Sequence, residues 1–158
     1  MPEKQVYFDA DVLLSYVNND ADRVPTIEAL LDEGRKAVPE IEIFTSEISI
    51  VEVAFGAAEQ QQRALDDETE GRINSLWMPG SPVRMVEYYR LIGDDAKSLM
   101  RLAITKGWSL KPMDAIHFAT ARRMKVAEFY TYDGRLAKFD SDVGFKVCEP
   151  YTRQTRLM

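Results

Sequence analysis

The sequence has little cysteine and no long hydrophobic run, and each absence removes a class of protein. Its single cysteine, Cys148, excludes an internal disulfide and a zinc site built from cysteines. No run of about 18 apolar residues is present, so we expect neither a transmembrane helix nor a membrane partner. The first residues, MPEKQVYF, lack the basic and apolar regions of a signal peptide, and we therefore expect a cytoplasmic protein.

Positive charge is scarce in the first half of the chain. The sequence carries 20 lysines and arginines against 26 acidic residues, a net charge of −6. Residues 1–79 contain 6 basic and 17 acidic residues (−11), whereas residues 80–158 contain 14 basic and 9 acidic ones (+5). The average argues weakly against a nucleic-acid partner, but this division is compatible with one surface that attracts phosphates.

The hydrophobic pattern alternates between strands and helices. With 158 residues, 46% of them hydrophobic, the chain can form one domain with a full core, which we place at residues 1–150, leaving 151–158 as a C-terminal tail. We expect strands at 4–8, 41–45, 83–86, 127–133 and 145–149. We expect helices ending near 17, over 26–37, from about 46 into 59–65, over 67–77 and 89–107, from 112 onward, and over 134–139. This alternation predicts an α/β fold with a mostly parallel central sheet of about five strands flanked by helices.

Two aspartates stand where the first strand gives way to the first helix, in QVYFDADVLLSYV. Asp9 and Asp11 could cap this helix, because a carboxylate accepts hydrogen bonds from the unpaired N–H groups of the first turn. The alternative is functional. Carboxylates at the carboxyl edge of a parallel sheet line the crevice where α/β proteins bind ligands, and two or more together hold Mg²⁺ or Mn²⁺.

A glutamate interrupts an apolar run in TSEISIVEVAFG. Glu52 shares a helical face with Ile48 and Phe55, which predicts that its carboxylate points toward the core. An unpaired buried carboxylate costs several kcal/mol, so it needs a cation, hydrogen bonds or a proton. A capping box formed with Ser49 is the structural alternative.

Two further acids lie at element boundaries. Asp114, in LKPMDAIHFATARRM, falls in the first turn of a helix begun by Pro112, where the helix dipole alone favours it. Asp133, in EFYTYDGRLAKF, ends a strand and could simply cap the short helix that follows. His117, between apolar neighbours, is more typical of a packed, hydrogen-bonded side chain than of a catalyst.

These four acids can converge at one edge of the sheet. Asp9 and Asp133 end strands, Asp114 opens a helix, and Glu52 projects from an apolar helical face. Four mutually repelling carboxylates are unstable together without a divalent cation. The sequence therefore predicts a site for Mg²⁺ or Mn²⁺.

Four segments, VYFDADVLLSY, TSEISIVEVAFG, KPMDAIHFATA and FYTYDGRLAKF, resemble in this order the PIN-domain ribonucleases, particularly the VapC-type toxins of prokaryotic toxin–antitoxin pairs. The resemblance spans nearly the whole chain. It implies a metal-dependent endoribonuclease that cleaves single-stranded or loop RNA and leaves a 5′-phosphate and a 3′-hydroxyl. It assigns catalysis and metal binding to Asp9, Glu52, Asp114 and Asp133. The implied partners are the RNA substrate and a small antitoxin protein, and a homodimer is compatible with the family.

Further positions match or depart from the family pattern. Ser46 corresponds to the family's small polar residue after the second strand, and Thr131 to its hydroxyl residue before the last acid. Asp11 stands where a neutral Asn, Ser or Thr is more usual, which leaves open whether it joins the metal shell. The region 59–82 is longer than in compact members.

Contact with RNA is assigned to basic residues near this end of the sheet. The candidates are Arg122, Arg123 and Lys125. Such residues neutralise backbone phosphates, although a charge run on a helix is usually only a solvated face.

Two other interpretations use the same residues differently. A phosphatase of the haloacid dehalogenase type would use Asp9 as nucleophile, IEIFTS as its hydroxyl motif and IGDDAKS as its acidic motif. That fold needs a lysine between the last two motifs, and none occurs between Thr45 and Asp94. The third interpretation is a catalytically idle PIN-like binding module. The intact acidic set disfavours it, since such a module has no reason to keep a costly carboxylate cluster.

Overall fold

Five parallel strands form the sheet of this protein, whose computed structural model describes residues 4–59 and 62–152. The strands are β1 (Lys4–Phe8), β2 (Ile41–Ser46), β3 (Val83–Val86), β4 (Glu128–Tyr130) and β5 (Lys146–Cys148), in the order β3-β2-β1-β4-β5. Every neighbouring pair is parallel, which confirms the predicted α/β class. The chain runs outward from β1 to β3 and then returns to β4, so a topological switch point lies between β1 and β4.

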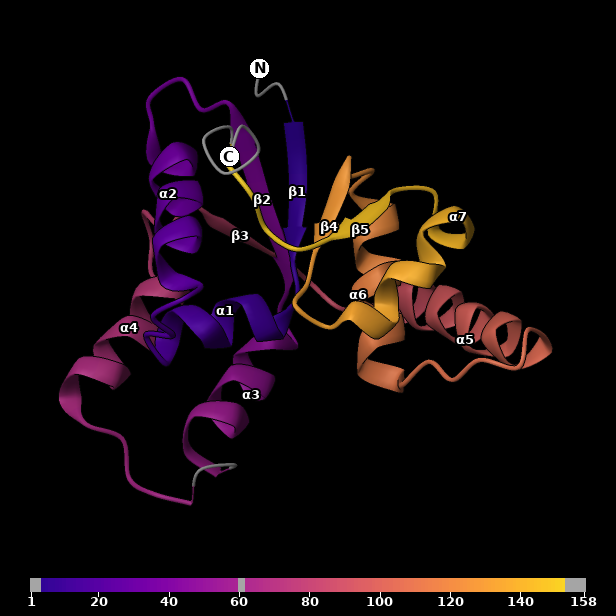
Figure 1. Cartoon of the computed structure of the whole chain (residues 1–158), viewed down its shortest axis with the longest axis horizontal. Helices are drawn as coiled ribbons and strands as arrows, with labels where there is room; N and C mark the ends of the chain where they lie inside the picture. The colour runs from indigo at the N-terminus through magenta and orange to yellow at the C-terminus, as the bar shows by residue number, and fades with distance from the viewer. Residues whose placement is uncertain (1–3, 60–61, 153–158) are drawn as a thin grey trace.

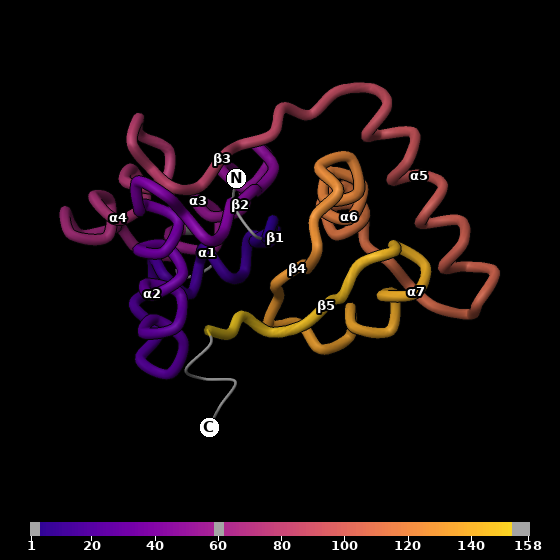
Figure 2. The backbone as a smooth tube through the Cα atoms, turned by 90° about the horizontal axis from the view of Figure 1, so that it is seen from above, coloured from indigo at the N-terminus to yellow at the C-terminus, as the bar shows by residue number. Residues whose placement is uncertain are grey.

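Helices cover both faces of the sheet (Figures 1 and 2). One side carries α1 (Ala10–Val17), α2 (Val24–Arg35), α3 (Ser49–Ala54) and α4 (Asp67–Trp77). The other side carries α5 (Arg90–Thr105), α6 (Pro112–Arg123) and α7 (Asp140–Val143). Short turns of π-helix (Phe55–Glu59) and 3₁₀-helix (Gly134–Phe139) follow α3 and β4. Within the described ranges, no helix is both long and apolar enough to cross a membrane.

The central strand supplies both hydrophobic cores because its successive side chains point to opposite faces. Val6 and Phe8 pack among the helices of the α1–α4 side. Tyr7 packs on the other side, where its ring stacks on Phe129 at a centroid distance of 5.1 Å. Phe118 of α6 lies against Phe129 in the same cluster. Burial on both faces explains why the strands read as nearly continuous apolar runs.

The helix predicted from about Ser46 into residues 59–65 begins three residues later and reaches only the first residue of that segment. The Ser46 hydroxyl accepts a hydrogen bond from the backbone N–H of Ile48, which makes a turn before α3 begins at Ser49. The helical stretch ends at Glu59; Gln60 and Gln61 lie outside the described residues, and 63–65 are not helical. The predicted core face is also wrong, because Phe55 is 58% exposed.

The helical stretch lies close to α1 at Gly56. A Cβ atom there would lie 2.5 Å from Cδ2 of Leu14, so a larger residue would force the Leu14 side chain to move. The buried stripe runs through Ser49, Val53 and Ala57, and Glu52 lies at its edge.

Other boundaries differ by a few residues. The predicted strand over 127–133 stops at Tyr130, because the Thr131 hydroxyl accepts the backbone N–H of Asp133 and turns the chain. The helix predicted over 26–37 lies at 24–35, and α7 was not predicted. Tyr151, in the predicted tail, donates a hydrogen bond to Glu128 over 2.5 Å. Residues 153–158 lie outside the described part, and the domain boundary at 150 stays a prediction.

Candidate active site

A cavity of about 630 Å³ lies at the carboxyl edge of the sheet, beside the switch point. Segments after β1, β2 and β4 and the start of α6 surround it. The charged residues that line it are Asp9, Asp11, Glu52, Lys111, Asp114, Asp133 and Arg135. The four predicted acids thus meet in one cavity, and their chemical roles stay predictions.

Asp9 is both a helix cap and a wall of the cavity. Its Oδ1 accepts a hydrogen bond from the backbone N–H of Val12 over 3.3 Å, which confirms that Asp9 caps α1. The side chain is only 4% exposed. Burial, and then the adjacent Asp11 carboxylate, raise the pKa of Asp9 well above its usual range. A cation in the cavity would relieve this penalty.

Asp11 ties α1 to the loop after β4. The Thr131 hydroxyl donates to Oδ2 of Asp11 over 3.1 Å, and the Tyr132 backbone N–H donates to Oδ1 over 3.2 Å. Thr131 also accepts the Asp133 backbone N–H, and it does not line the cavity. These contacts make Asp11 and Thr131 a brace that fixes Asp9 and Asp133 relative to one another.

Glu52 contacts a histidine from across the sheet. Its Oε1 lies 2.6 Å from Nε2 of His117, a residue that is 1% exposed. The other ring nitrogen, Nδ1, lies 2.6 Å from the phenol oxygen of Tyr7. His117 is therefore packed and hydrogen-bonded, as its sequence context indicated. The sequence did not reveal Glu52 as its partner.

The capping-box alternative for Glu52 is wrong. Helix α3 starts at Ser49, and no side chain caps it. The Ser49 hydroxyl instead pairs with the Thr45 hydroxyl over 2.8 Å, within the core. Ser46 is buried as well and does not line the cavity.

Asp114 occupies the first turn of α6, after Pro112, as predicted. Burial raises the pKa of its carboxyl group. Across residues 4–59 and 62–152, its carboxylate accepts no side-chain or loop hydrogen bond and forms no ion pair. The dipole at the start of α6 favours its negative charge.

Asp133 is fully engaged by its own neighbour. Its Oδ1 accepts a hydrogen bond from the backbone N–H of Arg135. Asp133 thus caps the 3₁₀ turn, which confirms the capping role considered for it from the sequence. The Arg135 guanidinium binds both carboxylate oxygens, Nε to Oδ1 at 2.9 Å and Nη2 to Oδ2 at 2.8 Å. Hydrogen bonding to Arg135 holds the pKa of Asp133 below its usual range.

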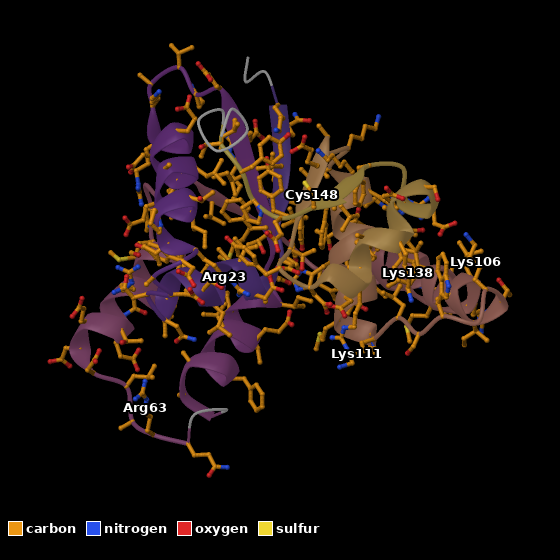
Figure 3. All side chains as sticks on the ribbon, viewed as in Figure 1. Arg23, Arg63, Lys106, Lys111, Lys138 and Cys148 are labelled. Atoms are coloured by element: carbon orange, nitrogen blue, oxygen red, sulfur yellow. The ribbon has the colours of Figure 1, made fainter. Side chains whose placement is uncertain are left out.

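The cations of the cavity are not those that the charge pattern indicated. Lys111 and Arg135 line it, and Figure 3 shows Lys111 where α6 begins. Arg122, Arg123 and Lys125 lie at or beyond the other end of α6, remote from Asp114. The guanidinium of Arg123 pairs there with Asp95 over 3.2 Å. The sequence offered one indication of these two cations: Lys111 precedes Asp114 by three residues in KPMD, and Arg135 follows Asp133 by two residues in DGR.

The side chains of the cavity suit a divalent metal in their chemical type. Among the described residues, no three acidic, histidine or cysteine side chains are close enough to form a ready metal site. The reason is visible in the contacts, because Glu52 is held by His117 and Asp133 by Arg135. All the donors are carboxylate oxygens, which Mg²⁺ and Mn²⁺ prefer. Asp9 is buried and Asp114 half-buried, both without a cationic partner, and a bound divalent ion would supply one.

These features define a class of protein: a parallel α/β fold with an acidic cavity at its topological switch point. The family model of the PIN domain matches residues 6–142. The chain therefore belongs to the PIN-domain family. No curated protein matches the sequence.

Several solved structures share this fold. VapBC2 from Rickettsia felis, bound to a DNA fragment from its promoter, is 14% identical, with a TM-score of 0.67 over 93% of this chain and 99% of that chain. FitAcB from Neisseria gonorrhoeae is 16% identical, with a TM-score of 0.64 over 92% and 97%. VapC20 from Mycobacterium tuberculosis, a sarcin-ricin loop cleaving toxin, is 18% identical, with a TM-score of 0.62 over 89% and 95%. At these identities the likeness shows a shared fold.

Proposed function

We propose that this protein is a metal-dependent endoribonuclease and the toxin of a toxin–antitoxin pair, acting in the cytoplasm on single-stranded or loop RNA. The observation that carries the proposal is the meeting of Asp9, Glu52, Asp114 and Asp133 in one cavity of a PIN fold. The similarity to VapC20, a toxin that cleaves the sarcin-ricin loop, supports RNA as the substrate.

Asp9, Asp114 and the second oxygen of Glu52 are the residues that would hold Mg²⁺ or Mn²⁺. Asp133 joins them when Arg135 releases its carboxylate. When bound, the metal lowers the pKa of a coordinated water and neutralises charge on the phosphodiester. Glu52 would orient a water molecule for in-line attack on the phosphodiester.

Lys111 and Arg135 serve the substrate in this proposal. They are the basic side chains of the cavity lining, and they stand among five carboxylates that would otherwise repel a phosphodiester. An arginine fork and a lysine ammonium at this position attract the RNA backbone and reduce that repulsion. Cleavage leaves a 5′-phosphate and a 3′-hydroxyl.

The partner is a small antitoxin protein. A toxin–antitoxin complex from Klebsiella pneumoniae is among the structures with the same fold, which supports this assignment. A homodimer stays an expectation. Co-purification of this chain with the product of an adjacent small gene would test the pairing.

The phosphatase alternative lacks support from the arrangement of its motifs. The Thr45 hydroxyl is buried and donates to the backbone oxygen of Phe8 over 2.8 Å. Asp94 lies on the exposed face of α5, beside Arg90. Neither residue lines the cavity with Asp9, so the three motifs do not form one site.

The deciding experiment compares two substrates. Structured RNA and p-nitrophenyl phosphate are each incubated with the protein and Mn²⁺, with and without EDTA. We expect RNA cleavage that EDTA abolishes and that Asp114→Asn removes, whereas the matched control Asp94→Asn cleaves at the wild-type rate. Turnover of the monoester with a phosphoaspartate on Asp9 would establish the phosphatase. Inactivity on both substrates, with every metal, would favour the idle binding module.

A further inference from the structure

We propose that His117 positions the Glu52 carboxylate in the cavity and that Tyr7 holds His117. The three side chains form a hydrogen-bond chain that begins at the central strand, β1, and ends at this carboxylate. His117 and Tyr7 are positioning residues in this proposal. The inference rests on the proposed function for its kinetic readout, but the hydrogen-bond chain itself can be measured without any activity.

The chain consists of two short contacts through one ring. The Tyr7 phenol oxygen lies 2.6 Å from Nδ1 of His117, and Nε2 of His117 lies 2.6 Å from Oε1 of Glu52. Tyr7 has no solvent-exposed surface. Its ring meets the imidazole edge-on at a centroid distance of 5.6 Å, so the imidazole is fixed by packing as well as by hydrogen bonds.

The direction of the chain follows from the protonated state of Tyr7. Burial raises the pKa of the Tyr7 phenol well above its usual range, so the phenol keeps its proton. In this proposal the phenol donates that proton to Nδ1 of His117, 2.6 Å away. A neutral imidazole that accepts at Nδ1 carries its proton on Nε2 and donates it to Glu52.

The contact joins helices that lie on opposite sides of the central strand. Glu52 comes from α3 and His117 from α6, which lie on opposite sides of β1 (Figures 1 and 2). Tyr7 belongs to β1 itself and does not line the cavity. Through His117 and Tyr7, strand β1 at the centre of the sheet thus holds Glu52 in place relative to Asp9 and Asp114.

As a consequence, one of the two carboxylate oxygens of Glu52 is occupied by a hydrogen bond. Oε1 is taken by His117, which leaves Oε2 for a metal or its water. A glutamate side chain has three rotatable bonds, and holding it before the substrate arrives avoids part of the ordering cost at the site. Groups that orient metal-binding side chains in this way typically change metal affinity or activity by about 10- to 100-fold when they are removed.

The first test is the protonation pattern of a single ring. His117 is the only histidine in the sequence, so a long-range ¹H–¹⁵N spectrum of the metal-free protein reports it without overlap. We expect one tautomer, protonated at Nε2 and bare at Nδ1, and a shifted Nε2 resonance in Glu52→Gln. A proton on Nδ1, in either a neutral or a doubly protonated ring, would overturn the proposed chain.

The second test uses Tyr7→Phe, because Tyr7 touches neither the cavity nor Glu52. Tyr130→Phe is the matched control, since Tyr130 is equally buried in the neighbouring strand but packs on the other face of the sheet. We expect Tyr7→Phe to lower kcat several-fold with KM for RNA unchanged, and Tyr130→Phe to change neither. His117→Leu should lower kcat by about tenfold or more, and His117→Gln, which keeps a donor for Glu52, should recover part of the loss.

Coupling to Glu52 separates positioning from general damage. In a Glu52→Gln background, Tyr7→Phe should cause little further loss of kcat, because the carboxylate that the chain serves is gone. Equal losses in both backgrounds, or equal losses in Tyr7→Phe and Tyr130→Phe, would overturn the proposal.

The same variants distinguish failure of the proposal from failure of the proposed function. If the wild type binds Mn²⁺ but cleaves no RNA, the nuclease assignment fails. Positioning is then judged by the Mn²⁺ concentration that gives half of the thermal shift, which must rise in Tyr7→Phe and not in Tyr130→Phe. If the wild type shows neither Mn²⁺ binding nor cleavage, both proposals are overturned.

Discussion

Arg135 grips Asp133 through both carboxylate oxygens, from Nε to Oδ1 at 2.9 Å and from Nη2 to Oδ2 at 2.8 Å. A residue predicted to bind metal is thus neutralised by a cation two positions along its own chain. Since the Arg135 side chain is largely exposed, this pair can open at little cost. Metal and Arg135 therefore compete for one carboxylate, and the competition yields the first prediction.

Arg135→Ala should affect metal and RNA in opposite directions. Freed from its partner, Asp133 becomes available to the metal, so Mn²⁺ should stabilise this variant at a lower concentration than the wild type. The loss of a phosphate-binding cation should raise KM for RNA several-fold. Thermal unfolding and steady-state cleavage measure the two effects, and Arg63→Ala, outside the cavity, serves as the control. Parallel weakening of both would show that Arg135 does not compete with the metal.

Glu52→Gln should separate stability from activity. The Gln amide oxygen can still accept from Nε2 of His117, so the metal-free free energy of unfolding should hold or rise as one charge leaves the repelling cluster. Cleavage should fall by at least about tenfold. Chemical denaturation in EDTA, together with RNA turnover, provides the comparison. Wild-type cleavage by this variant would remove Glu52 from the site.

Asp9→Asn should stabilise the metal-free protein in a pH-dependent way. Burial raises the pKa of Asp9 in the folded state, so the folded protein binds this proton more tightly than the unfolded chain. Wild-type stability is therefore lost as pH rises from the unfolded value, near 3.8, through the raised folded value. Each unit of difference corresponds to about 1.4 kcal/mol. Asparagine caps a helix about as well as aspartate, so the cap survives.

Denaturant unfolding of Asp9→Asn in EDTA should match the wild type near pH 3 and exceed it at pH 7. Added Mn²⁺ should reverse the order at pH 7, because only the wild type keeps this ligand. A constant difference across the pH range would mean that Asp9 is ordinarily ionised in the folded protein.

A second pH effect should arise far from the cavity, at Glu128. Burial alone would raise the pKa of Glu128, but hydrogen bonds from Tyr151, Lys4 and Tyr130 outweigh it and lower the pKa below the usual 4.5. The resulting stability is present above pH 4.5 and lost as pH falls through the lowered folded pKa. Tyr151→Phe should therefore cost about 1 kcal/mol at pH 7 and progressively less under acid. Unchanged stability at pH 7 would show that the Tyr151 hydroxyl contributes nothing.

The sequence by itself determined the layered architecture and the location of the acids. Strand and helix periodicity, and the turn chemistry at Asp9, Pro112 and Asp133, are local properties that a chain carries whatever its packing. Because successive parallel strands place their carboxyl ends on one edge, the convergence of the acids followed from the element order alone. The same local signals mark caps, which is why Asp9 and Asp133 prove to be caps and cavity residues at once.

Tertiary structure decided which partner each acid takes. His117 and Glu52 are 65 positions apart, and no local pattern joins them. Only the packing of α3 and α6 against opposite sides of β1 brings the imidazole to the carboxylate. The exposure of Phe55 was likewise decided by how its helical stretch packs on the rest of the domain. A side chain's partner depends on the relative placement of whole elements, and that placement is fixed by the sum of many weak packing contacts.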